Sequence, residues 1–147
     1  MKRNAGLRWL TILMLSVFFL TPAMAQTPPV VSEAPADVIA KGKELATKIC
    51  TIVVGEKRDE FEALLHSDVN AKENMHYWWD INGKIGDWNS LYDSCEFSHV
   101  SKESTLQNIR VFIKRTAKRG GKGMPVPVVF APDPKADNAY RITVSSL

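Results

Sequence analysis

The sequence lacks the short motifs by which common enzymes and metal proteins are recognised. It contains no HExxH or paired CxxC spacing, no GxSxG turn and no glycine-rich phosphate loop. The segment Asp80–Asp87 has a glycine and several oxygen ligands, but it lacks the alternating acids and the terminal Glu of a calcium loop. From these absences we expect neither a metal nor a cofactor.

Long apolar runs are equally scarce, and the run at Leu10–Leu20 is too short to cross a bilayer, which takes about 20 residues. Three basic residues precede it and Ala23-Met24-Ala25 follows, which is the order of a secretory signal peptide and its cleavage site. We expect residues 1–25 to be removed near Ala25. The mature chain would be periplasmic or secreted, without a membrane span, and the lack of a nearby Cys argues against a lipoprotein.

An excess of charge of one sign is also missing once the signal peptide is removed. Residues 1–25 hold three of the 19 Lys and Arg and none of the 16 Asp and Glu, so 16 basic and 16 acidic groups remain. This balance removes the main support for nucleic-acid binding. The charges are segregated, however, with a net −6 over residues 26–103 and a net +6 over residues 104–147. The fold could therefore have an acidic and a basic pole.

Cysteine is limited to Cys50 and Cys95. In an oxidising compartment we expect the two to form a disulfide. The alternative, a nucleophilic Cys, lacks local support, because Cys50 lies in an apolar helical pattern with no adjoining His. A bridge that closes a loop of this length would contribute on the order of 4 kcal/mol to stability.

Two helices are predicted after a flexible Pro-rich segment at residues 26–35. Apolar residues recur at helical spacing over Ala36–Val54, and Gly55 is a natural stop. A second helix is predicted over Asp59–His66, where Asp59 and Glu62 have the spacing of a capping box. The polar segment Ser67–Asn74 is predicted to be a connection.

The aromatic segment that follows has two interpretations. Asn82-Gly83 between Tyr77–Ile81 and Lys84–Trp88 is typical of a β-hairpin. The interpretation we favour is a short strand that ends at Asn82-Gly83, followed by a helix over about Ile85–Ser94. In a strand the adjacent Trp78 and Trp79 would point to opposite faces, so one of them would lie outside the core.

The remaining segments are predicted to be strands: Glu96–Val100, Leu106–Thr116, a strand that alternates at Val126, Val128 and Phe130, and Tyr140–Val144. In Leu106–Thr116 the alternation places Ile109, Val111 and Ile113 on one face and Arg110, Phe112 and Lys114 on the other. Pro125 and Pro127 cannot donate to a sheet, so the third strand should pair fully only from Val128 or lie at an edge. Residues 36–147 are therefore predicted to form a single α+β domain, in which N-terminal helices pack on a curved, cone-like antiparallel sheet of about four strands.

This order of elements resembles the nuclear-transport-factor-2-like superfamily, whose members share a cystatin-like cone. The resemblance is carried by KGKELATKICTIVVGEKRDEFEALLHSDV, a long helix followed by a shorter one, and by the turn NGKIGDW. It covers residues 36–147. It implies a pocket between the long helix and the sheet, which family members use for small apolar ligands, for isomerase or dehydratase chemistry, or for no ligand. No catalytic set of the family is matched position by position.

Several groups of residues are candidates for a site. His76 with Asp80, and His66 with Asp68, could each supply a base and its orienting carboxylate, and His99 is a further acid–base candidate. A ligand pocket would be lined by Trp78, Trp88, Tyr92 and Phe112. A basic contact patch would be formed at a hairpin tip by Lys114, Arg115, Lys118, Arg119 and Lys122.

The function most consistent with these features is that of an exported binding or protein-interaction domain without catalysis. Its partner would be a small apolar ligand or an envelope protein, and a homodimer is among the assemblies that the sequence allows. One alternative is a cofactor-free lyase or isomerase that uses His76, Asp80 or His99. Another is an inhibitor or immunity-type protein of the envelope.

Overall fold

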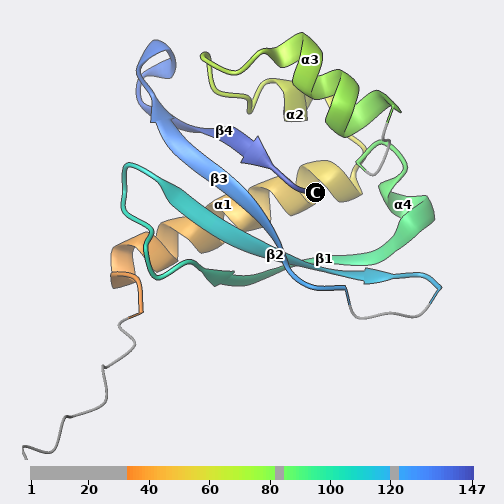
Figure 1. Cartoon of the computed structure of the whole chain (residues 1–147), viewed down its shortest axis with the longest axis horizontal. Helices are drawn as coiled ribbons and strands as arrows, with labels where there is room; N and C mark the ends of the chain where they lie inside the picture. The colour runs from red at the N-terminus through yellow and green to blue at the C-terminus, as the bar shows by residue number, and fades with distance from the viewer. Residues whose placement is uncertain (1–32, 82–84, 120–122) are drawn as a thin grey trace, which may run out of the picture. The chain divides into compact units, whose positions relative to one another are not determined.

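Helix α1, Ala36–Val54, begins and ends where the sequence predicts (Figure 1). One face of it is apolar and buried, because residues such as Leu45, Ile49 and Val53 recur at helical spacing. Gly55 follows as the predicted stop, but in a right-handed conformation, and the left-handed residue is Glu56 with φ of 51°.

The computed structural model describes residues 33–81, 85–119 and 123–147, and for Ile81 the backbone alone. These residues belong to one compact unit of the chain. The predicted signal peptide and its cleavage site, most of the Pro-rich lead-in, the Asn82-Gly83 turn and Lys122 lie outside the described residues.

Helix α2, Arg58–Glu62, is shorter than the helix predicted over 59–66. The capping box predicted for its start is wrong, because the N-cap is Lys57, whose side chain makes no capping bond. The helix ends early because Leu64–His66 pairs with the last strand. Ile142 N–H donates to the Leu64 carbonyl at 2.7 Å, and its own carbonyl accepts from His66 N–H at 2.9 Å.

The predicted connection Ser67–Asn74 contains the start of a third helix, α3, Ala71–Met75. Its N-cap is Asn70, whose side chain accepts a hydrogen bond from Glu73 N–H and donates one to the Glu73 carboxylate. The chain continues directly into η1, His76–Ile81, which is a π-helix. The strand predicted for this segment, and the hairpin that began with it, are therefore wrong.

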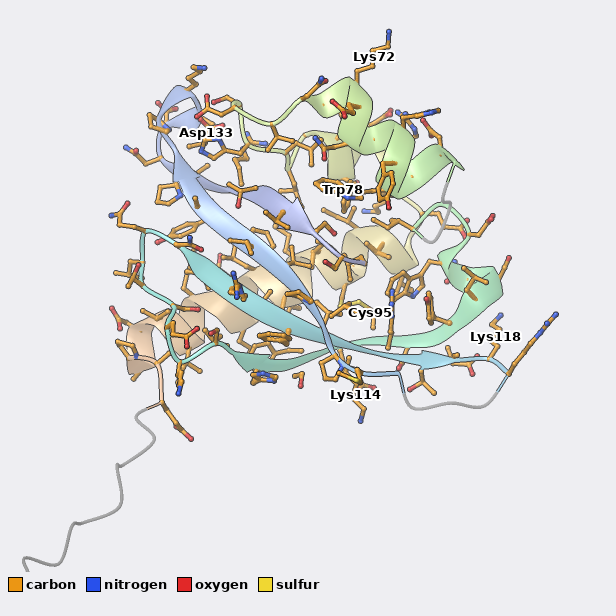
Figure 2. The ribbon with its side chains drawn as sticks, viewed as in Figure 1. Lys72, Trp78, Cys95, Lys114, Lys118 and Asp133 are labelled. Atoms are coloured by element: carbon orange, nitrogen blue, oxygen red, sulfur yellow. A yellow bond between two sulfur atoms is a disulfide. The ribbon has the colours of Figure 1, made fainter. Side chains whose placement is uncertain are left out.

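Because Trp78 and Trp79 lie on a helix, the prediction that they point to opposite faces is also wrong. Phe61 of α2 contacts both indoles, with ring centroids 6.3 Å from Trp78 and 5.4 Å from Trp79. Trp79 is buried and Trp78 is half-buried, on the inner side of η1 in Figure 2. Helix η1 is thus held against α2 by aromatic contacts.

The helix predicted over 85–94 is reduced to the single turn α4, Trp88–Leu91. Tyr92 already belongs to a strand, so the predicted helix is correct in kind and wrong at its C-terminal end. Trp88, the first residue of α4, has a fully buried side chain.

Four antiparallel strands complete an α+β fold: β1 (Tyr92–Val100), β2 (Ile109–Ala117), β3 (Val126–Asp133) and β4 (Ala139–Ser145). They form an open sheet in the order β1-β2-β3-β4, which Figure 1 shows as one twisted layer with α1 on one face. β1 begins four residues before the strand predicted there, and β3 extends past its predicted end.

The inner face of the sheet is the one that packs on α1. Ile109, Val111 and Ile113 of β2 are completely buried there. A Cβ on Gly42 would come within 2.5 Å of Val100 Cγ2, so the helix can approach the end of β1 only because residue 42 is glycine. The predicted alternation of β2 is confirmed, because Phe112, between Val111 and Ile113, faces the opposite, outer side.

The two edges of the sheet differ. β4 is bordered by the Leu64–His66 segment, whereas β1 has no backbone hydrogen bond to any described segment besides β2. β3 is an inner strand, so of the two options predicted from Pro125 and Pro127 the edge position is excluded. Its pairing with β4 begins at Val128, which is the other option that the sequence allowed.

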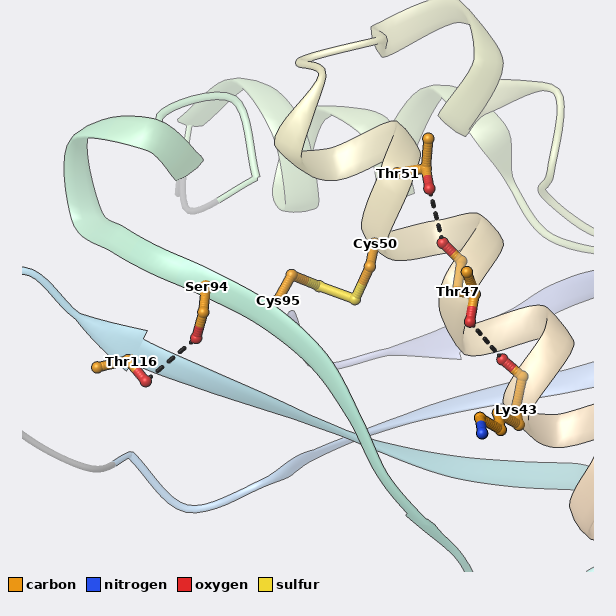
Figure 3. Close-up of a disulfide and its surroundings, with 7 residues drawn as sticks. All are labelled: Lys43, Thr47, Cys50, Thr51, Ser94, Cys95 and Thr116. Atoms are coloured by element: carbon orange, nitrogen blue, oxygen red, sulfur yellow. Dashed lines mark hydrogen bonds between the residues drawn. A yellow bond between two sulfur atoms is a disulfide. The ribbon is translucent and has the colours of Figure 1, made fainter.

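A disulfide joins Cys50 of α1 to Cys95 of β1, as predicted, with the two Cα atoms 5.4 Å apart (Figure 3). It connects the middle of the edge strand to the buried face of the long helix. Next to it, Ser94 Oγ donates to Thr116 Oγ1 across β1 and β2 at 3.1 Å. No helix among the described residues is long and apolar enough to cross a membrane.

Candidate functional site

His76 and Asp80 line one open groove of about 740 Å³ between α2 and α3–η1, which we call the α2–α3 groove. Within the described part of the chain, no hydrogen bond joins the two. Instead the Asp80 carboxylate accepts from the Arg58 guanidinium at 3.3 and 3.4 Å, and Arg58 also bonds Glu62 at 3.2 Å. The hydrogen bond to Asp80 raises the pKa of Arg58 above its ordinary value. Asp80 is therefore engaged by a cation and does not orient His76.

His99 lies elsewhere, on the outer face of β1. Its ring stacks on Phe112 with centroids 4.4 Å apart and an angle of 7° between the planes. Its Nδ1 lies 3.0 Å from Ser98 Oγ. The three acid–base candidates of the sequence are therefore divided between two places and do not converge on one point.

The His66 ring and the Asp68 carboxylate lie close together, with Nδ1 and Oδ2 3.8 Å apart, but the carboxylate does not hold the ring by a hydrogen bond. Asp68 N–H donates to His66 Nδ1 at 3.2 Å, so Nε2 carries the proton and donates to the Pro132 carbonyl at 3.3 Å. The Asp68 carboxylate is exposed and bonds Lys135 at 3.3 Å. His66 thereby ties the segment after α2 to the end of β3.

Beside His66 lies the buried carboxylate of Asp133, which Figure 2 places at the turn between β3 and β4. Burial acts to raise the pKa of Asp133. It is outweighed by hydrogen bonds from Ser67 Oγ, Ser67 N–H and Lys135 N–H, at 2.8 to 2.9 Å, and by nearby His66, so the pKa lies below its ordinary value. This ionised group stabilises the loop and has no access to a substrate.

The four aromatic residues predicted to line a pocket do not share one cavity. Trp88 is completely buried and packs on Tyr92, with ring centroids 4.7 Å apart. Trp78 packs on Phe61, and Phe112 lies on the outer face of the sheet. Only the contact of Trp88 with Tyr92 unites two of the predicted residues. Both side chains pack in the core, at the end of the sheet next to α4.

The predicted basic patch is also divided. Arg115 turns inward, with its guanidinium carbon 4.8 Å from the centroid of the Tyr92 ring, a cation–π contact. Lys118 and Arg119 are exposed near the end of β2, and Lys114 is exposed further back on the outer face; Lys114 and Lys118 are labelled in Figure 2. The described part of the patch is thus smaller than the sequence suggested.

The structure also contains a cleft that the sequence did not indicate, along the edge of β1 that no described segment pairs with. This cleft has a volume of about 600 Å³ and lies between the start of α1 and the second half of β1. We call it the β1 cleft, lined by Glu33, Ala34, Ile39, Phe97, Ser98, His99, Val100, Ser101, Lys102, Glu103 and Phe112.

The β1 cleft draws side chains from both faces of the strand. Val100 faces α1, as its approach to Gly42 shows, and Phe97 pairs with buried Ile113 on the same face. His99 stacks on Phe112 on the outer face. The change of face between Phe97 and His99 is accompanied by a bulge in the pairing with β2. The cleft therefore follows the backbone edge of β1 and not one face of the sheet.

The β1 cleft combines an apolar floor with charged groups at its rim. These charged groups, Glu33, Lys102 and Glu103, are exposed. Among the described residues, no cluster of His, Cys, Asp and Glu could hold a metal ion. Of the residues predicted for a site, only His99 and Phe112 line this cleft.

Comparison with family models, curated proteins and solved structures finds no match for this chain. The fold class therefore rests on the helices and the sheet themselves. The resemblance to the nuclear-transport-factor-2-like superfamily stays a prediction.

Proposed function

We propose that this chain is an exported, non-catalytic binding domain, and that the β1 cleft is its binding site. The observation that carries this proposal is a cleft with an apolar floor of Ile39, Phe97 and Val100, beside a strand for which the described residues supply no neighbour other than β2. A binding site needs a shaped apolar surface with a few polar groups at its rim, and the cleft has both.

The cellular setting follows from the disulfide and from the N-terminal sequence. A bridge between Cys50 and Cys95 persists in oxidising compartments. Together with the signal-peptide pattern of residues 1–25, it favours the periplasm or the cell exterior. In that setting the domain could be an inhibitor or immunity-type protein of the envelope. A place in the nuclear-transport-factor-2-like superfamily is also compatible with helices on one face of an open sheet.

The binding proposal can be tested by native mass spectrometry of protein exported by its own leader and purified without denaturation. We expect a bound mass on the unmodified protein. Ser98→Arg, which places a bulky side chain in the β1 cleft, should abolish it. The matched control Ala71→Arg places the same side chain in the α2–α3 groove and should retain the bound mass. Retention by Ser98→Arg, or no bound mass on the unmodified protein, would contradict the proposal.

The alternative of a small lyase or isomerase draws on a different observation, because His76 and Asp80 do line a common groove. Both are carried by a π-helix, an element that occurs often at functional sites. Loss of the bound mass in Ala71→Arg and its retention in Ser98→Arg would favour this alternative. It would then require that Asp80 leave Arg58 when a substrate binds.

A further inference from the structure

An edge strand has backbone N–H and C=O groups that point away from the sheet and can pair with another chain. At the β4 edge these groups meet Leu64–His66, through the two hydrogen bonds to Ile142. At the β1 edge, no described segment supplies such partners. Figure 1 shows β1 at the margin of the sheet, with β2 as its one neighbouring strand. Within the described part of the chain, the middle of the β4 edge is thus bridged at Ile142, whereas the β1 edge next to the cleft has no such bridge.

We propose that the occupant of the β1 cleft is an extended segment of a partner polypeptide, which adds to β1 as a fifth strand. This inference rests on the proposed function, since it names the kind of ligand that the β1 cleft binds. Backbone hydrogen bonds to β1 would supply affinity that does not depend on sequence, and the side-chain surroundings would select the sequence.

The shape of the cleft supports a strand over a small molecule. The side chains of an extended chain point alternately to its two sides. Beside β1, one set would therefore contact Ile39 and Val100 on the inner side. The other set would contact His99 and Phe112 on the outer side. Because the cleft is lined from both faces of β1, it can contact both sets of side chains. A compact ligand would need a surface on one face only.

The rim indicates the charge of the partner. Among the described residues that line the cleft, the carboxylates Glu33 and Glu103 outnumber the cation Lys102, and all three are exposed. We therefore expect apolar residues at alternate positions of the partner segment, with Lys or Arg among the others. The bulge between Phe97 and His99 interrupts the flat edge, so the segment should be short and should pair with the end of β1.

A second copy of the chain fits this edge less well. Antiparallel pairing of two β1 strands over their full length would place Glu96 opposite Glu96 of the second copy. Like charges directly opposite each other destabilise a sheet. A basic segment of another protein avoids this repulsion and meets the carboxylates of the rim.

The test uses the full mature protein and short fluorescein-labelled peptides with Val at alternate positions and Lys at the others. Binding is measured by fluorescence anisotropy. Matched peptides carry Glu in place of Lys, or N-methyl groups on one or the other alternating set of amides. Methylation of the amides that face β1 removes backbone hydrogen bonds, so one N-methyl pattern should weaken binding at least about tenfold while the other leaves it nearly unchanged. Amide protons of β1 should also gain protection from hydrogen exchange when the Lys peptide binds.

Charge variants at exposed positions test whether the peptide binds at the β1 cleft. Glu33→Lys with Glu103→Lys should weaken the Lys peptide by about tenfold. The control, Glu56→Lys with Glu60→Lys, makes the same change of charge at exposed positions by the far end of α1 and should bind normally. An equal loss of peptide affinity in the two double variants would overturn strand addition. Equal effects of the two N-methyl patterns would do the same.

A small apolar probe separates the failure of this inference from the failure of the proposed function. The fluorescence of anilinonaphthalene sulfonate reports occupation of an apolar cleft, and Ser98→Arg should remove the signal while Ala71→Arg keeps it. A probe that binds in this way, together with peptides that do not, would refute the fifth strand and leave the β1 cleft as a small-molecule site. If neither the probe nor the peptides depend on Ser98, both proposals fail.

Discussion

Reduction of the disulfide should destabilise the domain by an amount that can be worked out from its position. Cys50 and Cys95 are separated by 45 residues, and closing a loop of that length removes about 13 cal/mol/K of chain entropy from the unfolded state. At room temperature this corresponds to about 4 kcal/mol. With a urea m-value of about 2 kcal/mol/M, the unfolding midpoint should fall by about 2 M on reduction.

The assay is urea unfolding followed by circular dichroism, with and without a phosphine reductant. The double variant Cys50→Ala, Cys95→Ala controls for effects of the reductant, because its midpoint should not respond to it. The m-value should rise on reduction, since an unfolded chain without the cross-link exposes more surface. Equal midpoints for the oxidised and reduced protein would refute the reasoning and would mean that loop closure contributes little to stability.

Three further predictions concern packing and pH. Gly42→Ala should cost about 1–3 kcal/mol in urea unfolding, because its Cβ would lie 2.5 Å from Val100 Cγ2, and Val100→Ala in the same chain should recover part of the loss. Trp79→Ala should cost about 3–5 kcal/mol and Trp78→Ala less, because only Trp79 is buried. Since hydrogen bonds lower the pKa of Asp133, its stabilising contribution is complete above the unfolded pKa and is lost as pH falls below about 4. Asp133→Asn should thus be less stable at neutral pH and should lose less on acidification, whereas parallel acid profiles would contradict this assignment.

The parts of the fold that the sequence predicts well are those whose local pattern and tertiary packing agree. The apolar period of Ala36–Val54 is the same face that packs on the sheet, so both ends of α1 are predicted. The alternation of Ile109, Val111 and Ile113 matches their burial for the same reason. The disulfide is predictable because only two Cys are available.

The segment His76–Ile81 shows why other parts of the fold could not be predicted from the sequence. Tyr77, Trp78 and Trp79 have high strand propensity, and the following Asn-Gly dipeptide is typical of a hairpin. The helix forms because Phe61, distant in sequence, contacts both indoles, and this contact has no local signature. The spacing of Asn70 and Glu73 was a usable signal for the start of α3, since it is that of a capping box.

The candidate site was less predictable than the fold, because the sequence was searched for reactive side chains. His76, Asp80 and His99 attract attention by their chemistry, yet the structure pairs Asp80 with Arg58 and stacks His99 on Phe112. The β1 cleft is formed by ordinary residues from separate parts of the chain, such as Ile39 and Phe97. What makes it a candidate site is a strand edge that no described segment pairs with, which is a property of topology and not of residue type.

The disulfide and the cleft are connected through β1. An edge strand with one neighbour would ordinarily fray, and a ligand would then have to order it before binding, at a cost in affinity. Here β1 is attached to α1 at two points, by the bond from Cys95 to Cys50 and by the close approach of Val100 to Gly42. The β1 residues that line the cleft begin between these points, at Phe97. The strand edge is therefore held in place. If a peptide adds to β1 as we propose, reduction of the disulfide should weaken its binding even at temperatures where the reduced protein remains folded.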